Sequence, residues 1–146
     1  MDLEMRLAER SGDAERIIRL KARCGDEPAR RELNVLEGRG PGDFFPMGME
    51  RSGTILLLFD RFTFGDRWIS IQAGQGLYSE PRRVVPVSEY TEWEVGAIPN
   101  LIGSAVDLLT WEWPGYPSSD SLCVAPYTPT KIVKEVLNRM YIEFGD

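Results

Sequence analysis

Alternating apolar and polar positions predict a β-hairpin in the middle of the chain. Two such runs, Thr54 to Phe64 and Arg67 to Ala73, flank Gly65-Asp66, a pair typical of a two-residue hairpin turn. With this turn, Phe64 faces Arg67, Phe62 faces Ile69 and Asp60 faces Ile71. The apolar face then holds Leu56, Leu58, Phe62, Phe64, Ile69 and Ile71, and the polar face holds Arg61, Thr63, Trp68, Ser70 and Gln72. The pattern indicates a hairpin with one buried face.

Two further strands are expected after the hairpin. Tyr90 to Ile98 alternates, and Ala105 to Trp113 forms an apolar run that ends before Pro114-Gly115. In the first, the inward positions are Thr91, Trp93, Val95 and Ala97, and the outward positions are Tyr90, Glu92 and Glu94. In the second, one side carries Leu109, Trp111 and Trp113.

Helical spacing appears at the two ends of the sequence. Residues 1–37 lack aromatic side chains and predict two helices, separated at Gly25 and resumed at Pro28, before a loop at Gly38–Gly42. Near the other end, Thr128 and Pro129 suit a helix start. The apolar stripe of that helix comprises Ile132, Val133, Val136, Leu137, Met140 and Tyr141.

These elements predict an α+β fold. We expect an antiparallel sheet of about four to five strands, a packed C-terminal helix and an N-terminal helical arm. Residues 1–146 form one expected domain, with an arm at 1–37 and a sheet-plus-helix body at 44–146. A chain of 146 residues can bury one core of this kind.

Composition then narrows the chemistry. The chain has no histidine, which removes Ser-His and Cys-His nucleophile pairs and histidine-ligated metal sites. Its two cysteines, Cys24 and Cys123, form no metal-binding or redox motif. Neither a signal peptide nor an apolar run long enough for a bilayer is recognisable, so we expect a cytoplasmic protein without membrane contact.

Charge is distributed unevenly. The net charge of −6 disfavours direct binding of nucleic acid, which depends on Lys and Arg meeting phosphate. From Val84 to Thr130 there is no Lys or Arg. The acidic residues in this stretch are Glu89, Glu92, Glu94, Asp107, Glu112 and Asp120. This base-free stretch suits either a solvated face or a surface that binds a basic partner.

Motifs for catalysis and cofactors are incomplete. Gly74-Gln75-Gly76 begins like a dinucleotide loop, but Ser79 replaces the third glycine. Glu92 and Glu94 point the same way from one strand, as a two-carboxylate hydrolase requires, yet outward glutamates are ordinary on a strand. We therefore expect no catalytic residue, no cofactor and no metal ion, and a protein that is not an enzyme.

The run from Trp68 to Arg82, with its Ile-Ser-Ile-Gln-Ala-Gly-Gln-Gly-Leu-Tyr-Ser core, resembles a group of small uncharacterised bacteriophage proteins. The likeness continues through the segments Trp93–Ile98, Trp111–Trp113 and Tyr127–Pro129, so it covers about residues 54–141. It implies a phage or prophage accessory protein that works in a bacterial cell.

Together these features favour a non-catalytic protein that inhibits a host defence system, in the manner of anti-CRISPR or nucleic-acid-mimicking inhibitors. The expected partner is a host protein with a basic surface, such as a nucleic-acid-binding effector, because carboxylates on a rigid sheet can replace phosphates. The expected partner-binding residues are Glu89, Tyr90, Glu92, Glu94, Trp111, Glu112, Trp113 and Tyr116.

Two alternatives belong to other functional classes. The chain could sequester a small molecule such as a nucleotide signal, with Trp68 and the segment Gly74–Arg83 lining the pocket. It could also be a virion or assembly component, which predicts a stable homo-oligomer. The sequence leaves the oligomeric state open.

Overall fold

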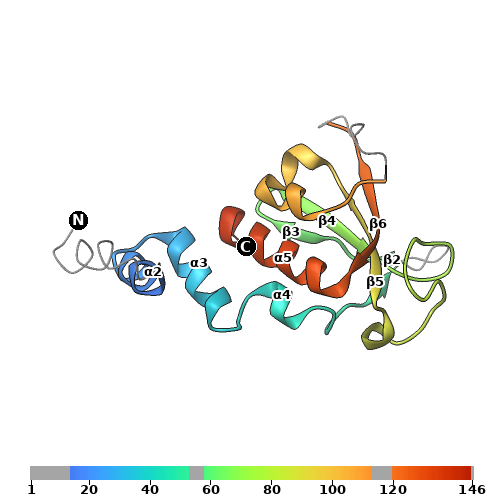
Figure 1. The fold of residues 1–146 in the computed structure, drawn as a ribbon, viewed down its shortest axis with the longest axis horizontal. Coiled ribbons are helices and arrows are strands. Elements are labelled where there is room, and N and C mark those ends of the chain that lie inside the picture. Colours follow the sequence, from blue (N-terminus) through green and yellow to red (C-terminus); the bar gives the residue numbers. More distant parts are fainter. Residues whose placement is uncertain (1–13, 53–57, 113–119, 146) are drawn as a thin grey trace.

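A computed structural model of the chain describes residues 14–52, 58–112 and 120–145 and confirms a mixed α+β fold (Figure 1). The helices are α2 (Ala14–Arg23), α3 (Glu27–Leu36), α4 (Pro41–Phe44) and α5 (Thr130–Phe144), with 3-10 helices η1 (Val87–Glu89), η2 (Pro99–Leu101) and η3 (Gly103–Leu108). The strands are β1 (Arg51–Ser52), β2 (Leu58–Phe59), β3 (Phe62–Phe64), β4 (Arg67–Gln72), β5 (Glu92–Ala97) and β6 (Cys123–Pro129). Strands β3, β4, β5 and β6 form an antiparallel sheet in that order, and β1 pairs with β2.

The predicted hairpin is confirmed around its turn. Phe64 pairs with Arg67 and Phe62 pairs with Ile69, while Gly65 adopts a φ of +67°. This left-handed conformation costs glycine little. The register expected from the sequence is therefore the observed one at β3 and β4.

The hairpin's first strand is interrupted, contrary to expectation. Asp60 and Arg61 separate β2 from β3, and this break shifts the alternation by one residue. As a result Phe59 is buried in the core, whereas Leu58 is half-buried on the opposite face. The predicted inward placement of Leu58 and the pairing of Asp60 with Ile71 are wrong, because β2 pairs with β1 instead of continuing β3.

The core lies between α5 and one face of the four-stranded sheet, as Figure 1 shows. Trp93, Val95 and Ala97 have no exposed surface, which confirms the predicted inward face within β5. Thr91, also predicted to face inward, is exposed because it precedes the strand. On α5 the predicted apolar stripe supplies the other half of the core, with Val133, Val136, Leu137 and Met140 fully buried. Every second residue of the strand therefore packs against apolar residues that recur every three to four positions along the helix.

The strand predicted at Ala105–Trp113 is wrong. Residues Gly103–Leu108 form the 3-10 helix η3, and the fourth strand of the sheet is β6. Ile102, Ala105 and Leu109 are the buried positions, and their spacing of three and four residues is helical. Strand β6 lies at the edge of the sheet, where its two prolines are tolerated, although they obscure the strand in the sequence.

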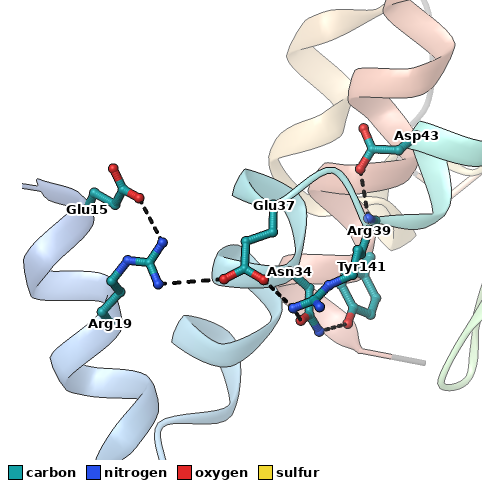
Figure 2. Close-up of polar contacts among 8 residues, drawn as sticks. Glu15, Arg19, Asn34, Glu37, Arg39, Asp43 and Tyr141 are labelled. Carbon is teal, nitrogen blue, oxygen red and sulfur yellow. Dashed lines mark hydrogen bonds and ion pairs between the residues drawn. The ribbon is translucent and has the colours of Figure 1, made fainter.

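The N-terminal arm is docked on α5 through α3 and α4, while α2 extends away from the sheet (Figure 1). Asn34 donates from Nδ2 to the Tyr141 hydroxyl at 2.9 Å, a contact that Figure 2 shows together with the ion pair between Arg19 of α2 and Glu37 at the end of α3. The expected loop at Gly38–Gly42 runs into the one-turn helix α4. Gly42 is required there, because a Cβ atom would lie 2.0 Å from the Lys134 carbonyl oxygen.

We expect Leu137→Ala to lower the free energy of unfolding by about 2–5 kcal/mol, as truncation of a buried leucine does. Leu137 has no exposed surface and lies on the helix face that packs against the sheet. Denaturant titration measures the loss, with the exposed Lys131→Ala on the same helix as the control. A loss below about 0.5 kcal/mol would contradict the packing of α5 described above.

Candidate functional site

The face of the sheet opposite α5 carries a groove of about 770 Å³. Its floor comes from the outward positions of β4, β5 and β6, and its walls come from β1, β2 and the loop after β4. The lining residues are Arg51, Leu58, Phe59, Arg61, Trp68, Ser70, Gln72, Gly74, Gln75, Gly76, Leu77, Val84, Glu94, Gly96, Leu122 and Val124. This volume lies within the range typical of ligand sites.

A side-chain amide holds one wall of the groove in place. Gln72 donates from Nε2 to the Phe59 carbonyl at 2.8 Å and accepts the Phe59 N–H at Oε1, at 2.7 Å. The amide therefore pairs with both backbone groups of Phe59, as a neighbouring strand would. Because Gln72 is buried, losing this pairing would leave polar groups unsatisfied.

Two arginines lie over aromatic rings at this wall. The guanidinium carbon of Arg61 lies 4.2 Å from the centre of the Trp68 ring, and that of Arg51 lies 4.2 Å from the centre of Phe59. Arg51 also donates to the Ala73 carbonyl at 2.9 Å and to the Tyr90 hydroxyl at 2.8 Å. These contacts orient cationic groups along the β2 side of the groove.

Gly96 leaves room at the floor. A Cβ atom at this position would meet Ser70 Cβ at 3.7 Å and Leu122 Cδ1 at 3.8 Å, which are ordinary contacts. The glycine is therefore not demanded by local packing. Because Gly96 has no side chain, the groove stays open above the middle of β5.

Glu94 is the ionisable group on the groove floor with the most perturbed environment. Burial raises the pKa of this carboxyl above its ordinary value of 4.5; the Tyr78 N–H lowers the pKa, Glu112 raises it and Arg82 lowers it. The N–H contact is long, at 3.5 Å. Among the described residues, Glu94 forms no ion pair within 4 Å. A half-buried carboxylate without a matched cation can accept hydrogen bonds from a positively charged ligand group.

Among the predicted partner-binding residues that the structure describes, Glu94 alone lines the groove. Glu94 and Glu112 are brought close enough for their charges to repel, and Glu112 lies beside β6, where its N–H donates to the Val124 carbonyl at 3.0 Å. Glu92 is half-buried and pairs with Pro129, and its backbone also bridges to Glu80. Trp111 is half-buried and packs against the core. Glu89 is exposed in η1, away from the groove lining, while Trp113 and Tyr116 lie outside the described residues.

The predicted outward placement of Tyr90 is wrong. Its side chain is buried, and its hydroxyl donates to the Arg83 carbonyl at 2.7 Å while accepting from Arg51 and from the Val85 N–H. Strand β5 begins at Glu92, so the alternation does not extend back to Tyr90. Tyr90 instead ends η1 and ties β1 to the loop before β5.

Arg51, Arg61 and Gln72 are not among the site residues expected from the sequence, whereas part of the groove coincides with the expected small-molecule pocket. Trp68 and the segment 74–77, named for a small-molecule pocket, do line it, whereas Arg82 and Arg83 do not. Arg61 and Trp68 could have been paired as neighbours across the hairpin. The double contact of Gln72 had no sequence signal, because it depends on the break after Phe59.

The described residues include no group of three histidine, cysteine or acidic side chains arranged to hold a metal ion. No described helix combines the length and apolarity needed to cross a membrane. Comparisons with protein-family models, curated proteins and solved structures found no match to the chain. The resemblance to phage proteins therefore stays a prediction.

The environment of Glu94 predicts a specific pH dependence of stability. Because the folded protein raises its pKa, Glu94 contributes stability below its ordinary pKa of 4.5 that is lost as the pH rises through the folded-state value. Glu94→Gln should remove this loss and raise the urea midpoint relative to wild type more at pH 7 than at pH 4. The exposed Glu89→Gln is the control. A variant whose midpoint falls at pH 7 would show that ionised Glu94 stabilises the fold.

Proposed function

We propose that this chain is a non-catalytic binding protein that holds a partner protein with a basic surface against the outer face of its sheet. The observation that carries the proposal is Glu94, a half-buried carboxylate on the groove floor without an ion-pair partner among the described residues. A cationic side chain of the partner would offset the cost of keeping that charge away from water.

Charge around the groove supports a basic partner. The β5 and β6 side of the groove comes from the base-free stretch, and Glu112 adds a second negative charge beside Glu94. Complementary charges of this kind speed encounter and select the partner, even where each exposed pair contributes little affinity.

Apolar side chains at the rim support a protein partner. Leu122 and Val84 line the groove while remaining 62% and 60% exposed. Exposed apolar residues beside a polar groove are typical of surfaces that another protein covers. These side chains would supply the apolar area of contact, and the charge of Glu94 would orient the partner.

The finer proposal is that the partner is a host nucleic-acid-binding protein and that binding inhibits it. Such proteins present arginine and lysine where phosphates bind, and carboxylates on a rigid sheet can occupy the same positions. The resemblance to phage accessory proteins motivates this choice, and the carboxylates on the β5 and β6 side of the groove are compatible with it.

One observation favours a second candidate, sequestration of a small molecule. Trp68 and the glycine-rich segment 74–77 line the same groove, with Arg61 lying over the Trp68 ring and Arg51 lying beside Gly74. An anionic ligand with a planar ring, such as a nucleotide, could use an aromatic face and a guanidinium group together. The negative charge of Glu94 disfavours this candidate.

Reversal of the charges on β5 should abolish binding of a basic partner. Proteins are captured from a bacterial lysate on the immobilised chain, and the purified partner is titrated at about 0.1 and 0.5 M salt. Glu92→Lys with Glu94→Lys should weaken binding well over tenfold, because repulsion replaces attraction. Asp107→Lys on η3, where the charge is exposed outside the groove, should bind like wild type. Equal affinity of all three proteins at both salt concentrations contradicts the proposal.

Substitutions at Gly96 test whether the partner occupies the groove, because they fill it without changing its charge. Gly96→Val places a β-branched side chain on the floor of the groove, and strand β5 accommodates such a residue. The variant should fail to bind the partner, while its melting temperature stays nearly unchanged. Gly96→Ala, whose Cβ makes only ordinary contacts, should retain binding. Nucleotides titrated against the same proteins test the second candidate. Full partner binding by a folded Gly96→Val protein would place the interface elsewhere.

A further inference from the structure

Two tyrosines lie side by side next to Glu94. The ring centres of Tyr78 and Tyr127 are 5.9 Å apart, and the residues are 37% and 39% exposed. Their backbones are also joined, because the Tyr127 N–H donates to the Tyr78 carbonyl at 3.0 Å and the Tyr78 N–H approaches Glu94 Oε1 at 3.5 Å. The pair therefore presents aromatic surface to solvent, and the backbone of one of its members lies beside the Glu94 carboxylate.

A bulge in the sheet places Tyr127 in this position. Trp93 pairs with Thr128 and Val95 pairs with Ala125, so Pro126 and Tyr127 together oppose Glu94. Tyr127 has a φ of +52°, the one positive value at a non-glycine position among the described residues. Bulges re-aim side chains, and here the bulged residue lies directly across from Glu94.

An arginine of the chain itself already lies on this aromatic surface. The guanidinium carbon of Arg82 is 5.3 Å from the centre of the Tyr78 ring, within the range of a cation–π contact. Arg82 Nε donates to the Leu77 carbonyl at 3.0 Å, and the charge of Arg82 favours the ionised form of Glu94. Arg82 does not form an ion pair with Glu94 within 4 Å in the described residues.

We infer that Tyr78, Tyr127 and Glu94 form a binding site for the guanidinium group of a partner arginine, and that Arg82 occupies part of this site in the free protein. Aromatic faces beside a carboxylate match a guanidinium, which stacks on rings and donates several hydrogen bonds in one plane. The inference rests on the proposed function and names the side chain that the partner inserts.

The arginine of a partner and Arg82 of the chain compete for the same site. An incoming arginine must replace Arg82 over Tyr78, so its apparent affinity is reduced by the fraction of molecules in which Arg82 is in place. The exposed end of Arg82 can return to water when displaced, since the residue is exposed. Removal of the Arg82 side chain should therefore strengthen binding of an external guanidinium group.

The probe for this site is arginine with blocked amino and carboxyl ends, titrated by NMR and observed at the tyrosine rings. Blocked citrulline, which has nearly the same shape without the charge, tests the chemistry. Arg82→Ala should bind blocked arginine roughly fivefold more tightly than wild type. The matched control is Arg83→Ala, a neighbouring exposed arginine outside the site, which should behave as wild type. Tyr127→Ala should weaken binding in the Arg82→Ala background.

The pKa of Glu94 provides a second readout that does not require the partner protein. In Arg82→Ala the pKa of Glu94 should rise, because a favourable cation is lost, and blocked arginine should lower it again. Equal affinity of wild type, Arg82→Ala and Arg83→Ala for blocked arginine, or equal binding of blocked citrulline, overturns the inference. In that case the proposed function is judged separately, since the charge reversal on β5 is measured with the whole partner protein.

Discussion

The packing of Trp93 is the interaction on which the rest of the structure depends. Its ring has no exposed surface and contacts Phe45 at 4.7 Å, Tyr90 at 5.1 Å and Phe59 at 6.1 Å between ring centres. Its indole Nε1 donates to Thr130 Oγ1 at 3.0 Å, at the first residue of α5. One side chain thus joins β5 to β2, to the residue that follows α4 and to the C-terminal helix. A large aromatic ring with a satisfied polar atom is well suited to this role.

Strand β5 builds the core and the groove from the same alternation. Its inward residues Trp93 and Val95 face α5, and its outward residues Glu94 and Gly96 form the groove floor. Because the period of a strand is two, neither face can change register without exchanging with the other. The rigidity of the buried face therefore fixes the position of Glu94. A carboxylate held in this way can bind a cation without first being ordered, which lowers the entropic cost of binding.

The groove carries opposite charges on its two sides. Arg51 and Arg61 lie over aromatic rings on the β2 side, while Glu94 and Glu112 gather on the β5 and β6 side. A uniformly acidic surface would attract any basic protein. The bipolar groove adds a directional requirement, because a partner must present its cations to one side only. This arrangement is more selective than the net charge of the chain suggests.

Local periodicity was enough to predict the hairpin turn, the inward face of β5 and the stripe on α5, because each depends on residues close together in the chain. The sequence also indicated Glu94, Glu112 and the segment 74–77 as functional candidates. The tertiary structure was required to bring Glu94 and the segment 74–77 into one groove and Glu112 near Glu94, since this depends on the Gln72 contact with Phe59 and on the bulge at Tyr127. The same holds for the burial of Tyr90 and for β6. Long-range pairing decided these features, and it can override local alternation wherever the buried contacts it creates stabilise the fold more than local preference does.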